Sequence, residues 1–229
     1  MTGCILNNFL NGAGSKCLRF GLALVLTLTV ARIGVCADAA SKMIHAIVQM
    51  SGTDFSAESF AAKPKIFWRA TSQYCRIDEE PDPANGIHGR MVVNEPDAWL
   101  INLADQTAKH VLDTGPTFNC KLPIFAYDPE TVSSKIGELE IGHELEFFQT
   151  NGAKLIDGPK LEFEAKYYEL KIADSVLRLV ERVDIHAPIL IGLVRGNKVS
   201  EAHYLLWGEV PFKADLFEKP TGVKIEEAK

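Results

Sequence analysis

The stretch IFWRATSQYCRIDEEPDPANGIHGRMVVNEPDAWLINLADQTAKHVL, residues 66–112, decides the fold class. It holds short runs rich in aromatic and β-branched residues, at positions 66–69, 73–77, 90–94, 98–103 and 108–112. Polar turns separate the runs, including a loop over residues 79–86 and the turn Glu95-Pro96-Asp97. Because strand and turn alternate at short intervals, the sequence predicts an antiparallel meander.

Strands resume in the C-terminal half, where we expect them over residues 161–172, 175–183, 189–195 and 198–210. The apolar alternation changes phase at Tyr167-Tyr168. Side chains in a strand alternate between faces, so this slip requires either a bulge or two aromatic residues that face opposite sides.

Two segments show helical rather than strand spacing. Residues 41–50, SKMIHAIVQM, fit a short helix or a first strand, and their apolar spacing favours the helix. Residues 128–148 have few turn signals and predict one or two helices, interrupted at Gly142. The sequence therefore predicts a mainly β protein of the α+β class, with helices between two β halves that cover one sheet face.

The N-terminal part has the pattern of a secretory signal. Lys16 and Arg19 precede the uncharged run FGLALVLTLTVA, and small residues suited to signal peptidase follow at Ala37 and Ala39. The run is shorter than the roughly 20 apolar residues of a spanning helix. We expect a signal peptide over residues 1–39, cleaved near Ala37 or Ala39.

A membrane anchor and a lipid-modified Cys36 are the alternatives to a cleaved signal. With cleavage, residues 40–229 form a single exported domain, located in the periplasm and not integral to the membrane. The whole chain carries a net charge of −6, and a product that starts at Asp38 carries −9 because three basic residues leave with the signal. This acidity argues against nucleic acid as a partner.

Cys75 and Cys120 lie in the exported part of the chain. In an oxidising compartment two cysteines are more often paired than free, so we expect a disulfide between them. Two separate buried thiols are the alternative.

No sequence motif indicates catalysis. His143-Glu144 begins a zinc-binding HExxH pattern, but Phe147 occupies the position of the second histidine, so His143 is expected to be a surface residue. No nucleophile elbow, phosphate-binding loop or dinucleotide fingerprint occurs. We therefore expect no enzyme, no cofactor and no metal site.

The strands are rich in aromatic residues. Most of these are expected to pack in the core, but some can line a concave pocket that holds an acyl chain. The candidate ligand-binding residues are Phe67, Trp68, Trp99, Phe163, Tyr167, Tyr204 and Trp207.

Three stretches resemble the LolA/LolB-like superfamily of periplasmic lipoprotein carriers. They are residues 67–76, with two arginine-bearing strands, residues 95–102, where a turn precedes Trp99 and an aliphatic run, and the closing segment FEKPTGVKI at 217–225. The resemblance implies an incomplete, curved antiparallel β-barrel with helices over its open side. The arginine that latches the lid in this superfamily corresponds to Arg69 or Arg76.

The resemblance also implies a function. It predicts a non-catalytic carrier or sensor whose cavity receives lipid acyl chains or a lipoprotein. An interaction module that binds another envelope protein is the alternative on the same fold, and an enzyme built from dispersed polar residues is a third.

Overall fold

The structure is a computed structural model that describes residues 41–53, 56, 59–112, 120–122 and 135–227. These residues belong to one compact unit, Asp38–Lys229. The expected signal peptide with its cleavage sites, Cys36 and the first part of the expected helical region, residues 128–134, lie outside the described residues.

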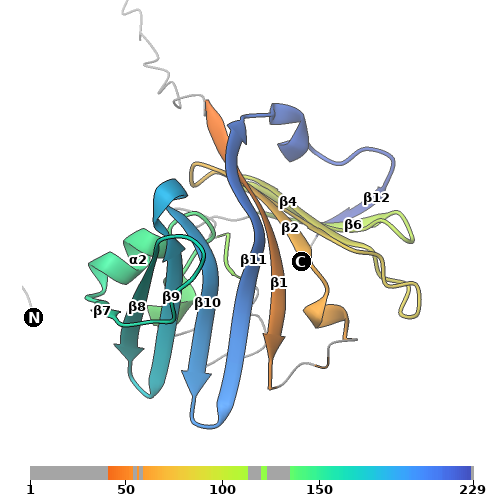
Figure 1. Cartoon of the computed structure of the whole chain (residues 1–229). Coiled ribbons are helices and arrows are strands. Elements are labelled where there is room, and N and C mark those ends of the chain that lie inside the picture. The colour runs from red at the N-terminus through yellow and green to blue at the C-terminus, as the bar shows by residue number, and fades with distance from the viewer. Residues whose placement is uncertain (1–40, 54–55, 57–58, 113–119, 123–134, 228–229) are drawn as a thin grey trace, which may run out of the picture. The chain divides into compact units, whose positions relative to one another are not determined.

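Twelve strands form one sheet (Figure 1). They are β1 (Lys42–Gly52), β2 (Lys65–Ala70), β3 (Tyr74–Glu79), β4 (Gly89–Asn94), β5 (Asp97–Asn102), β6 (Thr107–Leu112), β7 (Lys154–Ile156), β8 (Ala165–Ile172), β9 (Ser175–Arg182), β10 (Ala187–Arg195), β11 (Lys198–Pro211) and β12 (Lys224–Glu227). The helical elements are short: η1 (Phe60–Ala62), η3 (Lys135–Glu138), α2 (Glu144–Thr150), η4 (Val183–Ile185) and η5 (Ala214–Phe217).

The strand order is β12-β6-β5-β4-β3-β2-β1-β11-β10-β9-β8-β7. Two meanders, β2–β6 and β7–β11, therefore meet on either side of β1. The order ends at β12 and β7, so the sheet is curved but not closed into a barrel (Figure 1). This confirms the predicted mainly β fold class with an incomplete antiparallel barrel. One pairing departs from it, because β12 lies parallel to β6.

The expected helix at residues 41–50 is wrong, because this segment is strand β1. It pairs with β2 on one side and with β11 on the other. Ala46 and Val48 are buried on one face of the sheet and Met43 is buried on the other. A strand that is covered on both faces loses its alternation of apolar and polar residues, which explains the helix-like spacing.

The phase change at Tyr167 and Tyr168 is resolved without a bulge. Strand β8 pairs with β9 in continuous register from Ala165 to Ile172. Tyr168 is buried in the main core, whereas Tyr167 points to the opposite face and donates its hydroxyl hydrogen to the Pro159 carbonyl at 2.6 Å. The strand begins at Ala165, later than the expected residue 161.

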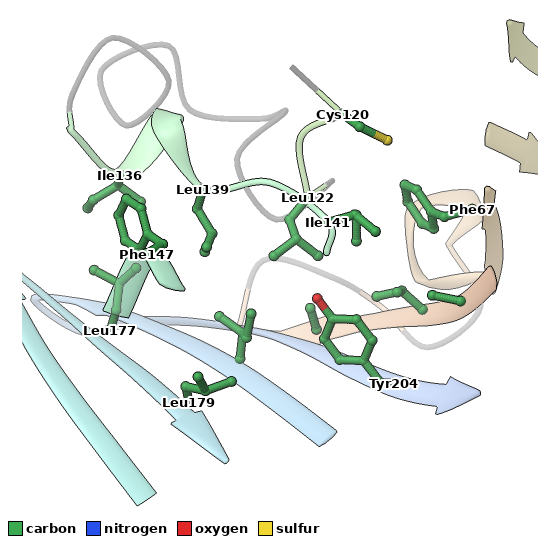
Figure 2. Packing of buried hydrophobic residues seen from close by; sticks show 14 of the residues in the cluster. Phe67, Cys120, Leu122, Ile136, Leu139, Ile141, Phe147, Leu177, Leu179 and Tyr204 are labelled. Atoms are coloured by element: carbon green, nitrogen blue, oxygen red, sulfur yellow. The ribbon is translucent and has the colours of Figure 1, made fainter. Parts of the chain in front are cut away.

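Residues 120–122 and 135–150, here called the covering segment, pack on one face of the sheet, which we call the inner face. Leu122, Ile136, Leu139, Ile141 and Phe147 meet strand residues such as Leu177, Leu179 and Tyr204 in the main core (Figure 2). Of the expected helices, η3 and α2 lie within the described residues, and they are separated near Gly142 as predicted. Gly142 has φ +90°, and a Cβ there would overlap the Ile44 side chain.

Two smaller apolar clusters lie on the outer face, opposite the covering segment. Phe217 of η5 packs with Met43 and Ala70, while Val223 and Ile225 pack on Val92, Trp99, Ile101 and Ala108. The C-terminal segment therefore covers the outer face of the β2–β6 half.

Candidate functional site

Residues on the inner face of β2–β6 form cross-strand rows, because directly opposed residues share a face. The middle row consists of Phe67, Ile77, Met91, Leu100 and Lys109. Phe67 is fully buried, Ile77 and Met91 are half-buried, and Leu100 is 50 % exposed. An apolar row thus leaves the core and continues to an uncovered part of the sheet.

A groove of about 560 Å³ lies over this uncovered part. Its volume is within the usual range for small-molecule sites, roughly 300–1,000 Å³. Its lining consists of Ile77, Glu79, Ile87, Gly89, Arg90, Met91, Leu100, Ile101, Asn102, Thr107, Ala108, Lys109 and Glu226. The apolar floor is the middle row, and the arrangement suits an elongated apolar ligand.

A polar row borders the floor on the side away from the covering segment. It contains Lys65, Glu79, Asn102 and Thr107, with Gly89 between Glu79 and Asn102. Lys65 Nζ lies 3.4 Å from Glu79 Oε1 and 5.0 Å from the centre of the Phe60 ring. The Glu79 carboxylate lies over Gly89, where a Cβ would overlap it. Because Gly89 has no side chain, the Glu79 carboxylate can lie close to the sheet at this border of the groove.

The row on the other side of the floor holds the covering segment. Arg69 donates to the Ile141 carbonyl at 2.9 Å and to the Glu140 carboxylate. Cys75, opposite Arg69 in register, forms the expected disulfide with Cys120 across a Cα–Cα distance of 5.8 Å. The disulfide prediction is confirmed. The sequence left Arg69 and Arg76 as alternatives for the arginine that contacts the lid. In the structure Arg69 contacts the covering segment.

Arg76 has a different role on the outer face. Its guanidinium pairs with Asp78 at 2.9 Å, donates to the Leu216 carbonyl at 3.3 Å and lies over the Trp68 ring. It therefore anchors η5 rather than the covering segment.

A buried carboxylate lies beside Arg69. Glu144 is 2 % exposed, accepts a hydrogen bond from the Tyr204 hydroxyl at 2.7 Å and another from the Gly142 amide at 2.9 Å. Burial raises the pKa of Glu144, while these hydrogen bonds and the charge of Arg69 oppose the rise. Burial, followed by the charge of Glu144, raises the pKa of Tyr204 well above its ordinary value. Burial also lowers the pKa of Arg69, although the negative charges of Glu140 and Glu144 act to raise it.

The structure does not bring the seven candidate aromatic residues together. Phe67, Tyr204 and Trp207 belong to or pack against the main core on the inner face. Trp68 stacks on His45, and Trp99 stacks on His110 beneath the C-terminal segment, both on the outer face. None of the seven lines the groove.

Phe163 and Tyr167 line a separate hollow of about 550 Å³ around residues 155–167. Arg182 lies 4.9 Å from the centre of the Phe163 ring. Ligand binding by the seven residues stays a prediction, and the groove supplies a different set of candidates.

Sequence reasoning missed the groove because its floor is aliphatic and its lining residues come from five strands, β3, β4, β5, β6 and β12. One signal was available in Trp99-Leu100-Ile101. Three consecutive apolar residues in a strand mean that both faces meet apolar surroundings. Trp99 and Ile101 are buried on the outer face, and Leu100 lies in the groove.

Two polar clusters are similar to catalytic patterns without matching them. Ser51 Oγ lies 3.0 Å from His203 Nε2, and Glu201 Oε2 lies 3.1 Å from the same nitrogen. In a serine-histidine-acid triad the acid instead binds Nδ1, which leaves Nε2 to the serine. His143 is exposed, as expected, and its Nδ1 pairs with Glu146 Oε2 at 2.7 Å.

No protein-family model and no curated protein sequence matches the chain. Several solved structures resemble it at low identity. An uncharacterized conserved protein from Thermus thermophilus is 8 % identical, with a TM-score of 0.48 over 82 % of this chain and 91 % of that one. The MucA/MucB complex of Pseudomonas aeruginosa gives 9 % identity and a TM-score of 0.44, over 81 % of this chain and 58 % of that one.

A LolA superfamily protein from Nitrosomonas europaea is also among the structural neighbours. It is 11 % identical, with a TM-score of 0.34 over 79 % of this chain and 90 % of that chain. In the part of the chain that the structure describes, no helix has the length and apolar character needed to cross a membrane.

Proposed function

We propose that this protein is a non-catalytic carrier or sensor of a hydrophobic ligand in the cell envelope. The observation that carries the proposal is the middle row of the inner face, where Ile77, Met91 and Leu100 form the floor of a groove of about 560 Å³. Each ligand methylene that leaves water for such a floor contributes about 0.8 kcal/mol. The signal-like pattern of residues 1–39 supports an exported location.

The covering segment defines where the ligand lies. Ile136, Leu139, Ile141, Phe147 and Phe148 fill the inner face over the β8–β11 half with the protein's own side chains. The groove over β3–β6 is therefore the place on the inner face where an apolar ligand adds contacts without displacing the core.

The test is lipid retention by the purified protein. Mass spectrometry of an organic extract is expected to find lipid in the wild type and little in Leu100→Glu, because that carboxylate would lie on the groove floor. Leu112→Glu is the matched control: Leu112 is 60 % exposed on β6 but faces the outer side. Extracts that are clean for the wild type, together with no uptake of added alkyl probes, would disprove the proposal.

A second candidate function is docking of another envelope protein on the outer face. The observation that favours it is the exposure of two leucines at the register shift of β11, Leu205 at 57 % and Leu206 at 40 %. A Leu205→Glu/Leu206→Glu variant that loses a defined envelope complex but keeps bound lipid would favour this function over ligand carriage.

A further inference from the structure

Lys109 is the last residue of the middle row and lines the groove directly beside Leu100. Within the described residues, the structure records no hydrogen bond or ion pair of its ammonium group. The other charged groups at the groove are paired. Glu79 lies 3.4 Å from Lys65, and Glu226, which faces Lys109 from β12, lies 2.8 Å from Lys224.

Arg90, the remaining charged lining residue, forms an ion pair with Asp78 on the outer face. Lys109 therefore supplies a positive charge at the shallow end of an apolar floor, and the acid opposite it in register, Glu226, is shared with Lys224.

We propose that the ligand of the groove is an anionic single-chain amphiphile, with its carboxylate or phosphate on Lys109 and its alkyl chain over Leu100, Met91 and Ile77. This inference rests on the proposed function and specifies the ligand class and its orientation.

The orientation follows from burial along the row. Exposure falls from Leu100 to Phe67, so the floor deepens away from Lys109 and ends against the core. A charged head at the deep end would lose its hydration, and the two cations that flank Phe67 there, Lys65 and Arg69, are already paired with Glu79 and Glu140. At Lys109 the head stays hydrated and paired. The alkyl chain takes the remaining direction, across β5, β4 and β3.

The length of the floor sets an expected chain length. Neighbouring strands are about 4.8 Å apart, so the three steps from Lys109 on β6 to Ile77 on β3 span about 14 Å. Affinity is expected to rise about fourfold per added methylene while the chain still covers new floor. It should level off once the chain reaches the core at Phe67.

The test compares alkyl probes of one length that differ in the head group. Equilibrium dialysis of delipidated protein against tetradecanoate, tetradecyl phosphate, tetradecanol and tetradecyltrimethylammonium is carried out at a pH of about 8, where the carboxylate is ionised. The two anions are expected to bind more tightly than the alcohol, and the cation more weakly. Lys109→Gln should weaken anion binding about three- to fivefold, the scale of an exposed ion pair, and leave alcohol binding unchanged. Lys213→Gln, at an exposed lysine just before η5 and away from both hollows, is the control.

The anion preference should also shrink as salt is added, because screening acts on the exposed pair. A larger effect with the phosphate would indicate a phospholipid-type head, and a larger effect with the carboxylate a free fatty acid; both support the anionic class. Equal affinity for acid and alcohol, unchanged by Lys109→Gln, would overturn this inference and leave the proposed function intact. Failure of every alkyl probe to bind would overturn both.

Discussion

Arg69 and Cys75 lie directly opposite each other on β2 and β3, and each holds the same part of the covering segment. Cys75 is linked to Cys120, and the Cys120 carbonyl accepts a hydrogen bond from the Ile141 amide at 2.9 Å. Arg69 in turn donates to the Ile141 carbonyl. The four residues form a closed ring of one covalent and three hydrogen-bonded or paired links, so the covering segment is fixed at the border of the groove.

The disulfide is expected to contribute strongly to stability. It joins residues 45 positions apart, and a loop of that length corresponds to about 4 kcal/mol in the chain-entropy model. A Cys75→Ala/Cys120→Ala variant should therefore unfold at a clearly lower denaturant concentration than the oxidised wild type. A reducing agent should lower the unfolding midpoint of the wild type toward that of the variant and leave the midpoint of the variant unchanged. Equal midpoints for the variant and the oxidised wild type would contradict the prediction.

Arg69 and Arg76 should loosen different segments when they are replaced. Arg69→Met removes the contacts to Ile141 and Glu140 and leaves the buried Glu144 without its nearby positive charge, at a cost of about 3–5 kcal/mol. Hydrogen exchange should accelerate in the covering segment for Arg69→Met. For Arg76→Met it should accelerate around Leu216 instead. The same pattern in both variants would refute this division of roles.

The fold was predictable where local pattern and pairing agree. The β2–β6 meander follows from short apolar runs separated by turn residues, and each run became a strand. Pairing between distant segments leaves no such local trace. The charged segment Lys224–Glu227 has no clear strand pattern, yet it forms β12 because β6 offers a free edge and Ile225 packs with Trp99 and Ala108.

The site was less predictable than the fold for a related reason. Aromatic residues suggested a pocket, but Trp68 and Trp99 face the outer side. Phe67 faces the inner side and is surrounded by other core residues. The face of each residue depends on strand register, and which part of that face stays uncovered depends on where the covering segment ends. Neither is encoded in the local spacing of Met91 or Leu100.

The hydrogen bond between Tyr204 and Glu144 should show as a strong pairwise coupling. Tyr204→Phe removes a donor from a buried carboxylate and is expected to lower the free energy of unfolding by about 1.5–3 kcal/mol. In a Glu144→Ala background the same replacement should cost much less, because the hydroxyl has already lost its acceptor. Denaturant unfolding of the four proteins of the cycle measures the coupling. Additive effects of the two replacements would show that the bond contributes little.

His110 should make the attachment of β12 depend on pH. Its Nδ1 lies 2.6 Å from Glu227 Oε2 and its Nε2 2.6 Å from Asp97 Oδ1, and these two hydrogen bonds, with Glu227 the larger cause, raise the pKa of His110 above its ordinary 6.5. Because the folded-state pKa is the higher one, the stabilisation is complete below a pH of about 6.5 and is lost as the pH rises through the raised pKa.

Hydrogen exchange at the Ile225 amide tests this dependence. The amide should exchange more slowly in the wild type than in His110→Gln at a pH below the raised pKa, and this difference should disappear at a pH above it. An NMR titration should place the His110 pKa above 6.5, and Glu227→Gln should lower it. A pKa at or below 6.5, or a wild-type-to-variant exchange ratio that does not change with pH, would show that this histidine does not hold the strand.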